Sequence, residues 1–81
     1  MTPDQRQLYA GEVVRAVYGT DPEETQMSRA DFGIIQRWMD LEIPLGVVIE
    51  ALGQMGRVAS IRHARPAVEE EWERTRRARG G

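Results

Sequence analysis

The sequence lacks cysteine, lysine and asparagine, contains a single histidine, and has only 6% aromatic residues. Without cysteine the chain forms neither disulfides nor thiolate metal sites, so its core and its helix signals must stabilise it unaided. No stretch approaches the about 18 consecutive apolar residues of a membrane span, and the polar residues 1–5 lack the layout of a signal peptide. We therefore expect a cytoplasmic protein that does not bind membranes.

Lysine and asparagine use A-rich codons, so their absence points to a GC-rich bacterial or phage gene. The length of 81 residues predicts a single domain, 1–81, because a second core would not fit.

Charge is unevenly distributed along the chain. All 11 basic residues are arginines, and 13 acidic residues bring the net charge to −2. Residues 1–56 hold four arginines against nine acidic residues, net −5, whereas residues 57–81 hold seven against four, net +3. The acidic total therefore hides a basic C-terminal third.

The first helix is predicted over about 3–18. Thr2 is a good N-cap, Pro3 suits the first helical position, and Gln5 completes a capping box. Apolar residues follow at three- and four-residue spacing. Gly19 indicates the C-terminal stop, and residues 20–26 read as a polar connector.

A second helix is predicted over about 28–41. Ser28 is the N-cap, Asp31 lies in the first turn, and Met27 and Phe32 form a hydrophobic staple. From Phe32 onward apolar residues form a stripe along this helix.

A third helix is predicted over about 44–56, from Pro44 to Gly56. Gly46 and Gly53 within it suggest a close helix–helix approach. The second and third helices together read as a helix–turn–helix-like pair at 28–56.

Residues 57–65 carry no clear signal, and their structure is left open. Pro66 fits the first position of a last helix over about 66–79, with a frayed C-terminal end. Its first half is rich in glutamate and its second half in arginine, which suits the helix dipole. The fold class is therefore all-α, a small bundle of about four helices.

No catalytic constellation can be assembled from these residues. Ser28 is better used as a helix cap, and Ser60 and His63 lie three residues apart without an acid to orient the imidazole. The glutamates from Glu69 onward suit a solvated helix face better than a metal site. We expect no enzyme activity, no cofactor and no metal.

Nucleic-acid binding is the first remaining possibility. Arginine binds phosphate bidentately, and a few such contacts give salt-sensitive, largely sequence-independent binding. The candidate side chains form two basic segments: Arg57, Arg62, His63 and Arg65, and then Arg74, Arg76, Arg77 and Arg79. The alternative for both segments is a solvated helix surface. The third helix is poorly suited to reading bases, since Gln54 is its one base-reading side chain.

Protein–protein contact is the second possibility. Aromatic residues dominate binding hot spots, and the candidate anchors are Tyr9, Tyr18, Trp38 and Trp72. The alternative is that all four line a small core.

From Tyr18 onward the chain resembles the C-terminal domain of DnaD-type primosomal replication proteins. The resemblance is carried by Tyr18-Gly19, the helix start at 27–31 with Ile35 and Trp38, the segment 48–52, and a closing element with Ile61-Arg62-His63, Val68 and Trp72. His63 stands where that family usually has tyrosine, Pro66 interrupts the closing element, and no winged-helix domain precedes it.

This resemblance implies an all-helical module that helps to load or position replication machinery. It also implies contact with single-stranded DNA through Arg57, Arg62 and Arg65, together with Arg74, Arg76 and Arg77. The sequence therefore predicts a non-enzymatic adaptor of a nucleoprotein machine that contacts nucleic acid or an acidic partner through its C-terminal arginines. The alternative is a protein-interaction subunit or homo-oligomer without a nucleic-acid role.

Overall fold

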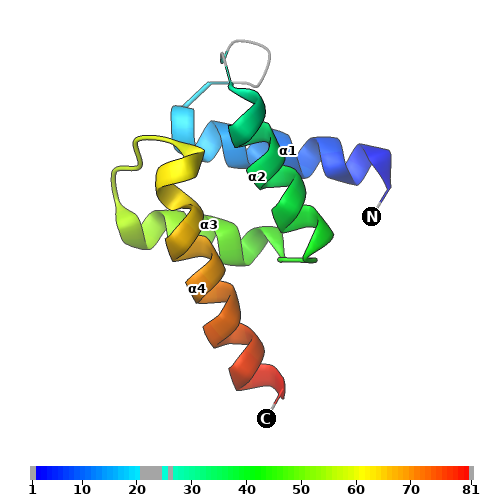
Figure 1. Ribbon diagram of the computed structural model, residues 1–81, viewed down its shortest axis with the longest axis vertical. Coiled ribbons are helices and arrows are strands. Elements are labelled where there is room, and N and C mark those ends of the chain that lie inside the picture. Colours follow the sequence, from blue (N-terminus) through cyan, green and yellow to red (C-terminus); the bar gives the residue numbers. More distant parts are fainter. Residues whose placement is uncertain (1, 21–24, 26, 81) are drawn as a thin grey trace.

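The computed structural model describes residues 2–20, 25 and 27–80, and these are arranged as four helices (Figure 1). In chain order they are α1, Pro3–Tyr18; α2, Arg29–Asp40; α3, Leu45–Met55; and α4, Ile61–Gly80. The described part of the chain contains no strand. The predicted all-α fold is confirmed. The predicted connector over residues 20–26 lies mostly outside the described residues.

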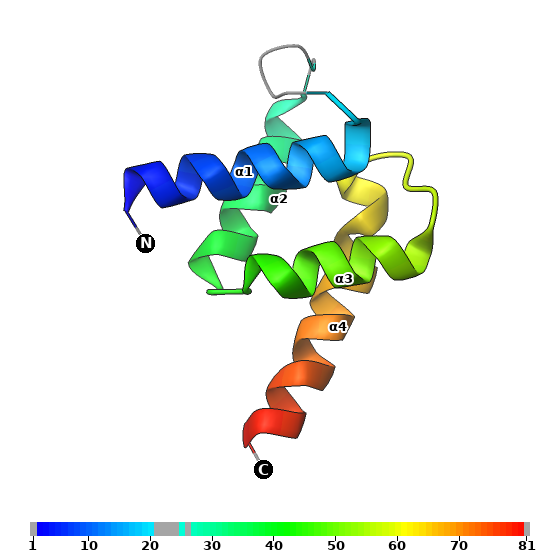
Figure 2. The same ribbon diagram turned by 180° about the vertical axis from the view of Figure 1, so that it is seen from behind.

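The four helices form two crossed pairs. Opposite views show α1 and α3 running across α2 and α4, with the C-terminal half of α4 projecting from the other three helices (Figures 1 and 2). The helix α1 packs on α2 and α3, and α4 packs on the same two helices from the other side. The short connection 41–44 places α3 at a steep angle to α2, as expected of a helix–turn–helix-like pair (Figure 1).

All four helices contribute to one core. Its largest fully buried side chains are Trp38, Ile35, Ile43, Ile61, Val13, Val14, Val48 and Val68. Because the buried residues of each helix recur at three- and four-residue spacing, each helix buries one side and exposes the other. No helix in the described residues is both long and apolar enough to cross a membrane.

The helix starts of α1 and α2 follow the sequence signals. The Thr2 hydroxyl accepts a hydrogen bond from the Gln5 backbone N–H (3.2 Å), and the Gln5 side chain accepts one from the Thr2 N–H (3.0 Å). Ser28 caps α2 by accepting from the backbone N–H of Asp31 (3.1 Å). Gly19 ends α1 with a φ of 74°, in the left-handed region. These caps are confirmed.

The connection from α2 to α3 is fixed by backbone bonds that end α2. The Ile43 N–H donates to the Trp38 carbonyl (3.0 Å) and the Glu42 N–H to the Met39 carbonyl (3.0 Å), the pattern of a Schellman motif. Glu42 occupies the left-handed position, with a φ of 59°. The Tyr9 hydroxyl donates to the carbonyl of Ile43 (2.8 Å), which ties this turn to α1 inside the core.

The predicted start of the last helix at Pro66 is wrong, because α4 begins at Ile61. Ser60 is its N-cap: its hydroxyl accepts from the His63 N–H (3.2 Å), and its carbonyl accepts from the Ala64 N–H (3.1 Å). Pro66 therefore lies inside the helix. The helix forms through it because Ile61 and Ala64 are fully buried on the helical side that faces the core. The helix continues to Gly80.

Two further expectations about packing are corrected. Gly46 and Gly53 do not mediate a close helix–helix approach, because a Cβ at either position would have no atom within 4 Å. Phe32 does not face the core with Ile35, since it is 43% exposed. It lies at the edge of the apolar stripe of α2.

Candidate nucleic-acid interface

Most of the side chains predicted to contact nucleic acid lie on one helix. Because α4 begins at Ile61, it carries Arg62, His63, Arg65, Arg74, Arg76 and Arg77, and only Arg57 lies in the preceding connection. All seven residues are exposed. Apart from Arg57, the two basic segments of the sequence therefore lie at the two ends of a 20-residue helix, which is about 30 Å long at the usual rise per residue.

The side of α4 that faces away from the core is basic at both ends. Ile61, Ala64 and Val68 define the buried side. Spacings of 11 and 3 residues place His63, Arg74 and Arg77 together on the opposite side. The distance from His63 to Arg77 along the axis is about 21 Å. We call this set, with Arg62 at its flank, the outward face of α4.

The glutamates of α4 are paired with arginines. Each lies within 3.6 Å of a guanidinium nitrogen, in the pairs Arg65–Glu69, Arg74–Glu70, Arg74–Glu71 and Arg76–Glu73. The arginine side chains of these pairs are 45–65% exposed, so the pairs reduce the local charge but leave the guanidinium groups accessible to other anions. Within the described residues, Arg57, Arg77 and Arg79 have no ion pair. Arg77 is thus the outward-face arginine most available to an anionic partner.

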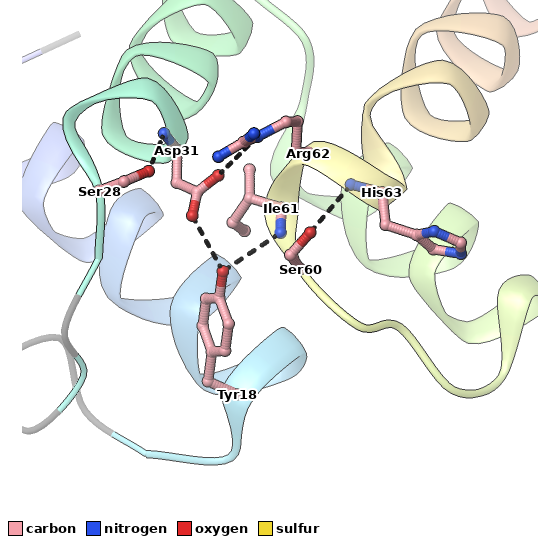
Figure 3. Close-up of polar contacts among 7 residues, drawn as sticks. All are labelled: Tyr18, Ser28, Asp31, Ser60, Ile61, Arg62 and His63. Carbon is pink, nitrogen blue, oxygen red and sulfur yellow. Dashed lines mark hydrogen bonds and ion pairs between the residues drawn. The ribbon is translucent and has the colours of Figure 1, made fainter.

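A polar cluster holds the N-terminal end of α4 against α1 and α2 (Figure 3). The Tyr18 hydroxyl donates to Asp31 Oδ2 (3.3 Å) and accepts from the backbone N–H of Ile61 (3.3 Å). Asp31 lies in the first turn of α2 and is only 7% exposed. The N-termini of α2 and α4 therefore meet at one buried carboxylate, an arrangement that both helix dipoles favour.

The same cluster places Arg62 on the surface. Its Nε lies 3.9 Å from Asp31 Oδ1, a buried oxygen without a hydrogen-bond partner, while its side chain is 68% exposed (Figure 3). Burial raises the pKa of the Tyr18 hydroxyl, with Asp31 adding to the shift. Tyr18 is a neutral donor to Asp31 at pH 7, which lies far below even the ordinary tyrosine pKa of about 10. Arg62 is thus loosely tethered on one side and open to solvent on the other.

Ser60 and His63 do not form a nucleophile–base pair in this arrangement. It is the backbone N–H of His63, and not its ring, that bonds the Ser60 hydroxyl, and Figure 3 shows the imidazole directed away from Ser60. Ser60 serves as a helix cap in the same way as Ser28. Among the described residues, no three His, Cys, Asp or Glu side chains are grouped so that they could hold a metal ion.

Two of the four predicted partner contacts lie inside the core. Tyr9 is 4% exposed and Trp38 is fully buried, so neither is a surface anchor and the prediction is wrong for both. Their polar atoms bond within the chain, Tyr9 to Ile43 and the Trp38 indole N–H to Glu69 (3.4 Å). Tyr18 and Trp72 are partly buried against the core.

Two exposed apolar side chains that the sequence did not predict as partner contacts lie on the neighbouring helices α1 and α2. Leu8 is 65% and Phe32 43% exposed, and both line a groove of about 850 Å³ between α1 and α2. The helical period could have identified Leu8 as exposed, because the buried Val13 lies five positions further along α1. Side chains five positions apart point in directions that differ by about 140° around the helix axis.

A second groove, of about 420 Å³, runs between the end of α2 and the middle of α4. Its apolar residues are Leu41 and Trp72, and its charged residues are Arg37, Glu42, Glu69, Glu73 and Arg76. Leu41 is 44% exposed, and Glu73 and Arg76 on the lining of this groove belong to the projecting half of α4.

The chain matches no protein-family model and no curated protein, and its structure matches no solved structure. The resemblance to the DnaD-type domain therefore rests only on the residues named in the sequence analysis and stays a hypothesis.

Proposed function

We propose that this protein is a non-enzymatic helical adaptor of a nucleoprotein machine, of replication type, that contacts nucleic acid through the outward face of α4. The observation that carries the proposal is the placement of Arg62, His63, Arg74 and Arg77 on a single exposed helix whose C-terminal half projects from the other three (Figures 1 and 2). A projecting basic helix can lie along a phosphate backbone without obstruction from the rest of the molecule.

Binding of this kind is independent of base sequence. Arginine guanidinium groups bond phosphate oxygens and release counterions, and such contacts carry no direct base readout. The helix α3 offers little to a base edge, since its exposed side consists of Gly46, Ile49, Glu50, Gly53 and Gln54. We therefore expect similar affinity for oligonucleotides of unrelated sequence.

The acidic character of the remaining chain supports an adaptor role. Residues 1–56 are net acidic, with nine acidic residues against four arginines. Contact with a polyanion is therefore restricted to the C-terminal third, and α1 and α2 stay free for a protein partner. The DnaD-type resemblance likewise implies that the C-terminal arginines contact nucleic acid.

Fluorescence anisotropy with labelled single- and double-stranded DNA at about 50 mM salt tests the proposal. We expect the double variant Arg74→Gln/Arg77→Gln to weaken binding about tenfold or more, because two phosphate contacts are lost. The control Arg15→Gln/Arg29→Gln removes the same charge from α1 and α2 and should change binding little. Equal losses in both variants would show that only the net charge matters.

The alternative is a protein-interaction subunit without a nucleic-acid role, and the groove lined by Leu8 and Phe32 favours it. Exposed apolar side chains lining a common groove are typical of protein contact sites. In that case Leu8→Gln/Phe32→Gln should abolish recovery of the native partner from cell extract, while Arg74→Gln/Arg77→Gln should leave it intact.

A further inference from the structure

From Glu69 onward, α4 has its charges separated along one side. Glu69, Glu73, Arg76 and Arg79 follow at spacings of four, three and three residues, which places all four within an arc of about 120° around the helix. The acidic residues come first and the basic residues last. This side borders the groove with Leu41 and Trp72, and it adjoins the outward face where Arg77 follows Glu73 by four residues.

The charges on this side of α4 are complementary to those on the same side of a second copy that runs in the opposite direction. In an antiparallel pair of α4 helices crossing near Glu73 and Arg76, Glu73 faces Arg76 of the second copy, and Glu69 comes within one residue of facing Arg79 of the second copy. A parallel pair would instead bring like charges together. The two-fold axis of an antiparallel pair forms each contact twice.

We propose that this protein forms an antiparallel dimer in which the Glu69–Arg79 segment of α4 packs against the same segment of a second copy. The exposed Leu41 and the partly buried Trp72 supply the apolar centre of the contact. Arg79 has no ion pair within the described part of its own chain, and it gains one across the dimer. The inference does not depend on the proposed function, because none of the four charged residues in this contact belongs to the outward face.

The size of the buried contact area gives an estimate of the affinity of the dimer. Residues 69–80 form a helical segment of about 18 Å, so one side of it buries an area at the lower end of specific interfaces. We therefore expect a dissociation constant in the micromolar range and a weaker dimer at high salt, because the charge pairs are solvent-accessible.

Analytical ultracentrifugation of the full chain, from about 1 to 500 µM at low salt, tests the dimer. Glu73→Arg and Arg76→Glu should each raise the dissociation constant about tenfold or more, because like charges then face each other twice. An equimolar mixture of the two variants should restore dimerisation, since the arginine introduced in one variant then faces the glutamate introduced in the other. This complementation separates contacts between copies from the Arg76–Glu73 pair within each helix.

The chain offers a matched control, because Glu12 and Arg15 on α1 form an exposed pair of the same spacing (3.0 Å). Glu12→Arg and Arg15→Glu should leave the dimer unchanged, with circular dichroism confirming equal helix content in all variants. A monomer at every concentration would overturn the inference, as would a dimer indifferent to both α4 variants. It would also be overturned if the mixture failed to associate, or if the α1 variants alone dissociated the dimer, which would place the contact at the Leu8–Phe32 groove.

Discussion

At the scale of single residues, two tyrosine hydroxyls join segments that are distant in the sequence. Tyr9 bonds the carbonyl of Ile43 at the turn between α2 and α3, and Tyr18 bonds both Asp31 and the first N–H of α4. Each hydroxyl satisfies a backbone group near the core that would otherwise lack a partner. Sequence patterns identify both tyrosines as apolar helix residues but do not reveal these partners, which depend on how the helices pack.

Tyr9→Phe should lower the free energy of unfolding by about 1–2 kcal/mol at pH 7, because the buried Ile43 carbonyl loses its donor. Burial also raises the pKa of the Tyr9 hydroxyl above its ordinary value of 10.0. The unfolded chain therefore deprotonates first as the pH rises above 10, and the native protein loses stability by up to about 1.4 kcal/mol per pH unit from this group. Below pH 10 the tyrosine is protonated in both states, so the free energy of unfolding does not decline through this group.

Urea unfolding between pH 8 and 11 measures both effects. Tyr9→Phe should be less stable at pH 8 but should show a shallower decline above pH 10, with Tyr18 providing the remaining slope since its pKa is raised in the same direction. Identical slopes in the two proteins would contradict the assignment.

Tyr18→Phe should destabilise the protein by about 1–3 kcal/mol, because Asp31 loses a donor and the Ile61 N–H loses its acceptor. The loss is local to the start of α4. In hydrogen exchange, the Ile61 amide should lose more protection than the amide of Val13 in the middle of α1. Equal changes at both amides would indicate a merely global effect.

Among the helices, sequence signals correctly predicted the ends that are fixed by hydrogen bonds between residues close in the sequence. Thr2 and Ser28 cap their helices as their sequence context indicates, and Gly19 ends α1. The start of α4 was missed because a rule about proline pointed to Pro66, while the burial of Ile61 and Ala64 decides the outcome. That burial comes from packing against other helices, which a local pattern cannot reveal.

Pro66→Ala should stabilise the protein by about 1–3 kcal/mol, because the ring no longer opposes the carbonyl of Arg62 and a helical N–H is restored. Urea unfolding should show a higher midpoint. Arg77→Ala, at an exposed and unpaired position of the same helix, should change stability by less than about 0.5 kcal/mol. A midpoint that is unchanged or lower for Pro66→Ala would contradict the account of α4.

In the molecule as a whole, the basic and acidic segments of the sequence belong to different helices. The described part of the basic segment, residues 57–80, forms α4 and the connection before it, whereas α1, α2 and α3 lie within the acidic segment 1–56. The sequence predicted the basic residues of the candidate site, but it divided them into two segments because it placed the helix start too late. For Tyr9 and Trp38 it left open a partner contact or a place in the core, and the structure buries both. It did not predict that Leu8 is exposed, since composition alone does not show which side of a helix is covered.

The salt dependence of binding to single-stranded DNA decides whether the arginines of α4 contact phosphate groups. With three to four phosphate contacts from the outward face and Arg57, a plot of log K against log salt concentration should have a slope of about −2 to −3. Arg74→Gln/Arg77→Gln should make that slope shallower by about 1.4. Absence of binding at about 50 mM salt, or a slope that the double variant leaves unchanged, would contradict a nucleic-acid role for α4.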